Sequence, residues 1–333
     1  MVSFKTGKKN LITDVPGLLI GNAQDEDLKS GVTVLFGEKP LLAGVNVMGG
    51  APGTRETELL APDKLVQKVD AIVLSGGSAF GLDAASGVTD ELKKIKRGFP
   101  TAAMPVPIVP SAILYDLDNG GKKGWTQNPY RELGITALNL AATDFELGSF
   151  GAGIGATTND FKGGLGSASL ILENGCTVSA LIAVSSVGST TVGKSKYFWA
   201  APFELNGEFG NFGVAPFFNN SDNGWTSKKP FKRDATTIGI VATDAVLDKA
   251  QANRIAMAAQ DGIARAIFPS HTPFDGDLLF SVSTREIELE DSTFDTLKIG
   301  HAAAQCVARA IARAVYNARP GLNDSLPCWS QAD

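Results

Sequence analysis

The sequence contains few of the residues that metal and redox chemistry use. Its 333 residues include two histidines, His271 and His301, and three cysteines, Cys176, Cys306 and Cys328. No C-x-x-C or H-E-x-x-H spacing occurs, and a zinc site would need both histidines together with carboxylates or thiols. We therefore expect no catalytic metal. An odd number of widely spaced cysteines is typical of reduced thiols, which predicts a cytoplasmic protein.

The chain also lacks an excess of basic charge. Its net charge is −5 and its isoelectric point is about 5.2, so no basic surface exists on the scale that nucleic-acid binding requires. The one basic cluster, KKPFKR at Lys228–Arg233, is compatible with a localisation patch or with a solvated loop. We expect no nucleic acid among the partners.

Long hydrophobic runs are absent too. No apolar run reaches the roughly 18 residues that a membrane span requires. The N-terminal region carries Lys5, Lys8 and Lys9, but Asp14 and Pro16 soon interrupt the apolar residues that follow. This pattern is unlike a signal peptide, so we expect no membrane partner.

What the chain does contain is enough apolar surface for a large core, in one large domain or two. Hydrophobic residues make up 44% of it and charged residues only 20%, and the 37 glycines indicate a loop-rich globular protein. Short apolar runs bounded by glycine or polar residues predict strands at 31–36, 41–48, 71–77, 236–243 and 277–284.

Helical spacing and turn chemistry predict the remaining elements. We expect a helix after Gly81 and helices over 247–267 and 292–317, the last with one face formed by Leu297, Ala303, Val307, Ile311 and Val315. The Asn174-Gly175 pair predicts a type I′ turn in a hairpin over 168–184. Strands followed by alanine-rich helices favour α+β layers in which helices cover sheets.

Two glycine-containing motifs are superficially similar to known catalytic or binding motifs. LSGGSAFG (74–81) fails the G-x-S-x-G pattern of a nucleophile elbow, because Phe80 stands where the last glycine is required. GAGIGA (151–156) fits G-x-G-x-x-A, but neither a clear strand before it nor a helical pattern after it supplies the context of a dinucleotide site. We interpret the first as a strand-to-helix turn and do not assign the second to a dinucleotide.

The junction in KRDATTIGIVATDAVL (232–247) suggests a nucleophile that needs no histidine. A charged stretch passes through the small Ala235 into Thr236, at the start of an apolar strand. A strand that begins with two threonines is common. However, a chain cut before Thr236 would expose an α-amine with a pKa near 7.7–8.0, well suited to act as base for the threonine hydroxyl. FDGD adds two carboxylates, Asp275 and Asp277, just before another predicted strand.

Several long motifs, in this order, resemble the L-aminopeptidase/D-esterase family, which includes β-aminopeptidases and 6-aminohexanoate-oligomer (nylon-oligomer) hydrolases. The resemblance covers most of the chain. It rests on NLITDVPGLLIGNAQD, GVTVLF, GGAPGTRETELL (49–60), VLSGGSAFGLDAASGV (73–88), GAGIGATTNDFKGGLGSAS (151–169), TTIGIVATDAVLDKAQANRIA (236–256) and HTPFDGDLLFSVST (271–284).

The resemblance implies a single catalytic domain over 1–333, folded as a four-layer α/β/β/α sandwich of the N-terminal-nucleophile type. It also implies self-cleavage between Ala235 and Thr236, which gives an α chain 1–235 and a β chain 236–333, and assembly as a homotetramer or larger. Thr236 matches the nucleophile, and a threonine with Asp275 and Asp277 is similar to the nylon-oligomer hydrolase branch.

Three further positions match residues that line the family's site. Tyr115, in SAILYDL, and Lys162, in DFKGG, can both donate hydrogen bonds to an oxyanion. Ser185 stands where the family usually has an oxyanion-binding asparagine, and its hydroxyl is a shorter donor. Asn159 is an asparagine near Lys162 in sequence, but we do not assign it the role of the missing asparagine.

These observations lead to an autoprocessing N-terminal-threonine amide hydrolase acting on small peptides or ω-amino-acid oligomers through an acyl-enzyme. This mechanism needs no cofactor. The alternatives are an acyltransferase similar to ornithine acetyltransferases, which also cut at Ala-Thr, and an inactive homologue that acts as a binding protein.

Overall fold

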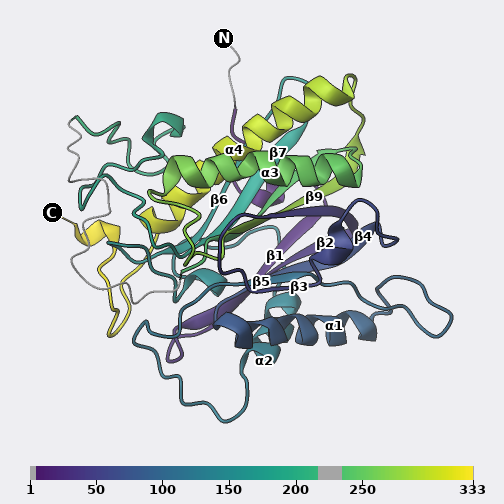
Figure 1. Cartoon of the computed structure of the whole chain (residues 1–333), viewed down its shortest axis with the longest axis horizontal. Coiled ribbons are helices and arrows are strands. Elements are labelled where there is room, and N and C mark those ends of the chain that lie inside the picture. Colours follow the sequence, from purple (N-terminus) through teal and green to yellow (C-terminus); the bar gives the residue numbers. More distant parts are fainter. Residues whose placement is uncertain (1–4, 217–234, 333) are drawn as a thin grey trace.

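The computed structural model of the chain describes residues 5–216 and 235–332 (Figure 1). The basic cluster at 228–233 lies outside these residues, so both interpretations of it stay open. Within the two described ranges, no helix is both long enough and apolar enough to cross a membrane.

Strands and longer helices account for the regular structure. The strands are β1 (Leu18–Asp25), β2 (Ser30–Val47), β3 (Thr54–Arg55), β4 (Lys68–Ser75), β5 (Ser111–Ile113), β6 (Gly164–Ile171), β7 (Thr177–Val184), β8 (Ile238–Ala245) and β9 (Leu278–Ile287). The longer helices are α1 (Ala84–Lys94), α2 (Tyr130–Asn139), α3 (Lys249–Ala266) and α4 (Ser292–Tyr316). The short 3₁₀ turns include η3 (Ser78–Asp83), η4 (Gly151–Gly153) and η7 (Trp329–Gln331).

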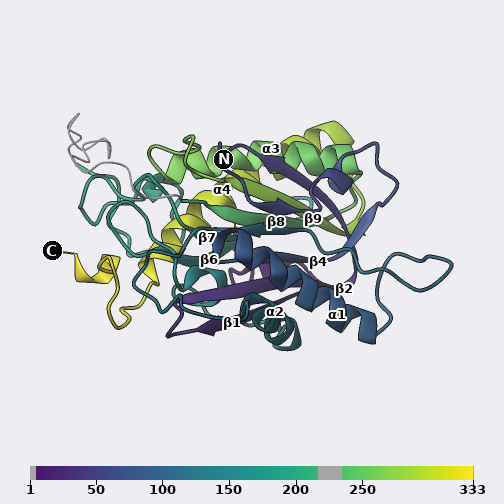
Figure 2. The ribbon, with the colours of Figure 1, turned by 60° about the horizontal axis from the view of Figure 1, so that its bottom comes forward.

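Four layers are visible when the molecule is turned (Figure 2): α3 and α4, the strands β6 to β9, the strands β1, β2 and β4, and then α1 and α2. The strands follow the order β3-β5-β4-β2-β9-β8-β7-β6, with β1 paired to β2. The first part of β2 pairs with β1 and β4, and its last part, from Leu42, pairs with β9. Strand β2 thus passes from one sheet layer to the other, and the predicted α/β/β/α sandwich is confirmed.

Three hydrophobic clusters fill the three spaces between the layers. One joins α3 and α4 to β6 and β7, and another joins α1 and α2 to β2 and β4. The central cluster takes residues from both sheets, such as Ile72 of β4 with Ile240 of β8. Because alternate side chains of a strand point to opposite faces, a strand between two clusters is apolar on both faces, as β8 is.

The predicted helices are found, with small differences at their ends. Helix α3 begins at Lys249, because Asp248 caps it by accepting a hydrogen bond from the amide of Gln251 at 2.7 Å. Helix α4 buries Ala303, Val307, Ile311 and Val315. Leu297, which was expected on the same face, is 64% exposed, so that face does not extend to it.

Two sequence-based predictions of strand and turn structure require correction. The expected strands at 31–36 and 41–48 are one long strand, β2, whose pairing with β4 shifts register between Phe36 and Leu41. The hairpin turn is not type I′, because Gly175 has a positive φ of 85° and Asn174 does not. Leu172 and Cys176 close a three-residue loop, which places glycine at the left-handed position of a bulged turn.

Candidate functional site

The candidate site lies where two neighbouring parallel strands begin. Strands β8 and β9 pair in register, with Ile238 opposite Leu278, and a bridge joins Ala235 to Asp275. Because this pairing continues outward from the strands, the segment 235–237 lies alongside the segment 275–277. Residues some 40 positions apart in sequence therefore meet at one end of the sheet.

The hydroxyl of Thr236 is held against the carbonyl group before it. Thr236 is buried, and its Oγ1 donates to the carbonyl oxygen of Ala235 at 2.6 Å. The amide of Gly276 donates to that same carbonyl oxygen at 3.0 Å and lies 3.2 Å from Thr236 Oγ1. A Cβ at Gly276 would stand 2.7 Å from the hydroxyl, so this approach requires glycine. The Gly276 amide thus contacts both the hydroxyl oxygen of Thr236 and the carbonyl oxygen of Ala235, the two oxygens that an acyl transfer at this position would involve.

Asp277 is buried beside the nucleophile candidate and is fully engaged. Its Oδ1 accepts from the amide of Thr237 at 2.8 Å, and its Oδ2 accepts from the amide of His271 at 3.1 Å. The His271 ring Nδ1 lies 3.0 Å from Oδ2 but does not form a well-directed hydrogen bond. These contacts hold the carboxylate against the backbone of Thr237, the residue just before β8.

Asp275 is the second buried carboxyl group of the site. It accepts hydrogen bonds from the amide of Val187 at 3.1 Å and from the amide and hydroxyl of Thr272 at 3.0 and 2.5 Å. Burial, and then the nearby carboxylate of Asp277, raise the pKa of Asp275 above its ordinary value. The pair is therefore an acidic site in which the two carboxyl groups differ in environment.

The turn after β2 fixes the backbone that carries both aspartates. The amides of Met48 and Gly49 donate to the carbonyl oxygen of Asp277, each at 3.0 Å. The amide of Ala51 donates to the carbonyl oxygen of Asp275 at 2.9 Å. The motif that begins at 49 thus belongs to the scaffold of the site.

Thr237 connects Ser185, and beyond it the backbone of Tyr115, to this centre. The Thr237 hydroxyl donates to the carbonyl oxygen of Ser185 at 3.0 Å. The hydroxyl of Ser185 itself lies 3.3 Å from the carbonyl oxygen of Thr157 and 3.5 Å from that of Tyr115. The Asn159 side chain donates to Asp160. In this arrangement the Ser185 hydroxyl is turned toward backbone carbonyl groups.

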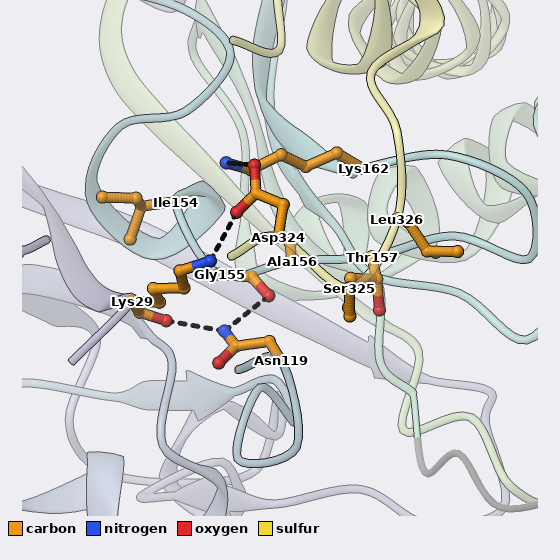
Figure 3. A pocket seen from close by; sticks show the side chains of 10 residues that line it. All are labelled: Lys29, Asn119, Ile154, Gly155, Ala156, Thr157, Lys162, Asp324, Ser325 and Leu326. Atoms are coloured by element: carbon orange, nitrogen blue, oxygen red, sulfur yellow. Dashed lines mark hydrogen bonds and ion pairs between the residues drawn. The ribbon is translucent and has the colours of Figure 1, made fainter. Parts of the chain in front are cut away.

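Lys162 belongs to a different cluster. Its ammonium donates to the carbonyl oxygen of Arg319 at 3.1 Å and to Asp324 at 3.0 Å, rather than to Thr236 or either aspartate of the site. Lys29 donates to the other oxygen of Asp324 at 2.7 Å (Figure 3). The structure thus brings Thr236, Asp275 and Asp277 into one network and places Lys162 in an adjoining one.

A buried polar cluster lies behind Tyr115. Asp116 accepts from the hydroxyl of Ser30 at 2.6 Å and from the amide of Gly77 at 2.8 Å, and Tyr130 donates to Ser30 at 2.9 Å. Burial raises the pKa of Asp116 to about 6. This cluster ties the LSGGSAFG turn, which does run from β4 into η3, to the segment that carries Tyr115.

Sequence reasoning missed several residues that hold the candidate site, some in direct contact with its aspartates and others at a distance from them. These are Lys29, Asp116, His271, Thr272 and Asp324. Lys29 and Asp324 are 295 positions apart in sequence, and no local pattern indicates their contact. His271 and Thr272 stand just before FDGD in the sequence. Hydrogen bonds from their backbone amides to the nearby aspartates were therefore the one contact that the sequence could have suggested.

Comparison with known proteins places this geometry in a family. The sequence profile of Peptidase family S58 matches residues 10–323. A Mycobacterium tuberculosis protein named uncharacterized aminopeptidase is 39% identical, and the match covers 93% of this chain and 95% of that protein. A 6-aminohexanoate-oligomer endohydrolase from Paenarthrobacter ureafaciens is 28% identical over 85% of this chain and 78% of its own length.

Solved structures show the same fold. A β-aminopeptidase from a Burkholderia species superposes with a TM-score of 0.72 at 21% identity, covering 99% of this chain and 93% of that one. An L-aminopeptidase D-Ala-esterase/amidase from Ochrobactrum anthropi, described as a variant of the Ntn hydrolase fold, gives 0.71 at 22% identity, with 98% and 92% covered. The N-terminal-nucleophile type of fold is thereby confirmed.

The buried Asp116 predicts a specific pH dependence of stability. The folded state binds this proton more tightly than the unfolded state, so the free energy of unfolding should fall as pH rises from about 4 to about 6. Asp116→Asn removes this effect. The stability of the native protein relative to the variant should decrease by about 2.5 kcal/mol between pH 4 and pH 7.5. Urea unfolding at several pH values measures it, with Asp118→Asn, an exposed position in the same loop, as the control. Parallel pH profiles for native protein and Asp116→Asn would contradict the prediction.

Proposed function

Because this chain belongs to peptidase family S58, we propose that it is an amide-bond hydrolase that activates itself by cutting between Ala235 and Thr236. The observation that carries this proposal is the contact of Thr236 Oγ1 with the Ala235 carbonyl group, together with the Gly276 amide that donates to the same oxygen. The whole chain, 1–333, acts as one catalytic domain, cut into 1–235 and 236–333.

The proposed cut is an acyl shift followed by hydrolysis. Thr236 Oγ1 attacks the carbonyl carbon of Ala235, and the negative charge that develops on the oxygen is stabilised by the Gly276 amide. The C–N bond breaks as the hydroxyl proton passes to the Thr236 nitrogen, leaving an ester. Water hydrolyses this ester to an Ala235 carboxylate and a free Thr236 hydroxyl with its own α-amine.

In the cut enzyme, the α-amine of Thr236 takes the proton of the hydroxyl as it attacks a substrate amide. Asp277 holds the backbone at Thr237, and Asp275 lies next to it, so both carboxyl groups orient the new N-terminus and tune its amine. Tyr115, Lys162 and Ser185 are the proposed donors to the substrate oxyanion. An acyl-enzyme forms, and water releases the product.

The proposed substrates are small peptides or ω-amino-acid oligomers. The support for this is the pair of relatives, one named an aminopeptidase and the other a 6-aminohexanoate-oligomer endohydrolase. Reaction at an amine-terminated amide fits a site with two carboxyl groups, because a substrate ammonium is attracted to them.

We also propose a cytoplasmic homotetramer or larger assembly. Free, buried thiols at all three cysteines fit a reducing compartment. Exposed apolar side chains of α3 and α4, namely Met257, Phe294 and Leu297, fit an interface between copies. Light scattering coupled to size exclusion should give a mass of at least four chains, and a monomer would refute the assembly.

The nucleophile is tested by intact mass and by activity. Native protein should convert from one species of 34.8 kDa to two, residues 1–235 and 236–333. Thr236→Ala should stay whole and lose hydrolysis of a small aminoacyl anilide and of 6-aminohexanoate oligomers by about 10⁴-fold or more. Thr236→Ser keeps a hydroxyl and should still cut.

Several outcomes would overturn this proposal. Processing of Thr236→Ala would mean that the cut site is wrong. Native protein that stays whole and inactive would favour a binding protein, and acetyl transfer to glutamate without amide hydrolysis would favour an acyltransferase.

The close approach of Gly276 to the Thr236 hydroxyl leads to a second prediction. Gly276→Ala puts a methyl group 2.7 Å from Thr236 Oγ1 and 2.6 Å from the carbonyl oxygen of Ala51. Both contacts are too short, so the Thr236 hydroxyl must move from its position against the Ala235 carbonyl group. The rate of self-cleavage should fall roughly 10²-fold. The matched control is Gly124→Ala, where a Cβ meets nothing within 4 Å. Cleavage of Gly276→Ala at the native rate, followed by mass spectrometry, would rule out this geometry.

A further inference from the structure

Two buried lysines share one carboxylate at the side of the candidate site. Lys29, just before β2, and Lys162, just before β6, are 8% and 6% exposed. Both ammonium groups bond to Asp324 of the C-terminal segment, one to each carboxylate oxygen (Figure 3). The amide of Gly321 donates to the same carboxylate at 2.6 Å. Two positive charges thus depend on one negative charge in a poorly solvated place.

The two lysines change the pKa of the carboxyl group that they share. Burial opposes its charged form, but the hydrogen bonds from Lys29, Lys162 and the Gly321 amide, together with the charge of Lys162, outweigh burial and lower the pKa of Asp324 below its ordinary value. The cavity among these side chains has a volume of about 10 Å³, enough for a single water molecule. The cluster therefore holds its own side chains tightly, and Lys162 is one of them.

What it holds is Lys162, and through Lys162 a wall of the candidate site. The backbone of Lys162 bridges to Thr157 and also donates to the carbonyl oxygen of Pro327 at 2.8 Å. The carbonyl oxygen of Thr157 accepts from the hydroxyl of Ser185, whose own carbonyl oxygen accepts from Thr237. The contacts run without interruption from Asp324 to the residue after Thr236.

An ammonium group has three N–H donors. The carbonyl oxygen of Arg319 and the carboxylate of Asp324 accept from two of those on Lys162. If Asp324 were absent, Lys29 would repel Lys162, and the orientation of the ammonium would be lost.

We propose that Asp324 is a positioning residue, which orients the Lys162 ammonium for the substrate oxyanion by binding it together with Lys29. This rests on the proposed function, because Lys162 acts there as an oxyanion donor. It also gives the C-terminal segment a purpose: Asp324 lies in the proposed β chain and both lysines lie in the proposed α chain. The cluster therefore joins the two chains at the site after the cut.

The test uses the full-length, self-processed enzyme with Asp324→Ala. Because an oxyanion donor acts mainly in the transition state, kcat should fall about tenfold or more while KM stays within about twofold. Sodium formate should restore kcat several-fold by supplying a carboxylate to the two lysines, and Asp324→Glu should retain most of it. Leu322→Ala, an exposed position in the same segment, is the control and should match native enzyme.

Formate is compared with sodium chloride at equal ionic strength and with formamide, which is neutral and of similar size. Rescue by all three alike, or a native kcat in Asp324→Ala, would overturn the proposal. If Asp324→Ala does not fold, Asp324→Asn replaces it, and a native kcat there has the same consequence. Native enzyme that neither cuts nor hydrolyses would refute the proposed function, whereas active native enzyme with an unaffected Asp324→Ala would refute only the role of Asp324.

Discussion

The parallel pairing of β8 and β9 is the interaction on which the candidate site depends. It sets Ile238 opposite Leu278, and the bridge between Ala235 and Asp275 continues it beyond the ends of both strands. This pairing alone brings the segments 235–237 and 275–277 side by side. Because β8 and β9 lie between two hydrophobic clusters, a slip of one residue in β8 would move each of its side chains from one cluster into the other, so the packing of both clusters favours this register.

Buried carboxyl groups recur around this junction, and each is stabilised by a different kind of donor. Asp277 and Asp275 accept chiefly from backbone amides and from Thr272, and within residues 5–216 and 235–332 no lysine or arginine is bonded to either of them. Asp324 is instead paired with two lysines. A pair of buried carboxyl groups attracts an amine, whereas a lysine-paired carboxylate orients cations. The two sites therefore suit different tasks in amide hydrolysis.

Much of the fold could be predicted from the sequence because its signals are local. Helical spacing of alanine and isoleucine located α3 and α4, and apolar runs located β8 and β9. Where prediction was wrong, tertiary context decided. Strand β2 is one strand because it belongs to both sheets. Leu297 is exposed because it lies outside the buried face of α4, which already includes Asp295 and Ile299. The turn at Gly175 differs because loop closure between Leu172 and Cys176 selects a three-residue connection.

The sequence by itself determined which residues could supply the chemistry: a threonine after a small alanine, and two aspartates around a glycine. Such residues are recognised by their neighbours along the chain. Only the tertiary structure decided that the Gly276 amide lies between the hydroxyl and the carbonyl group, that Ser185 turns to backbone oxygens, and that Lys162 is held by Asp324. Those facts depend on contacts between segments brought together by the packing of four layers, and no period or motif along one segment encodes the position of another.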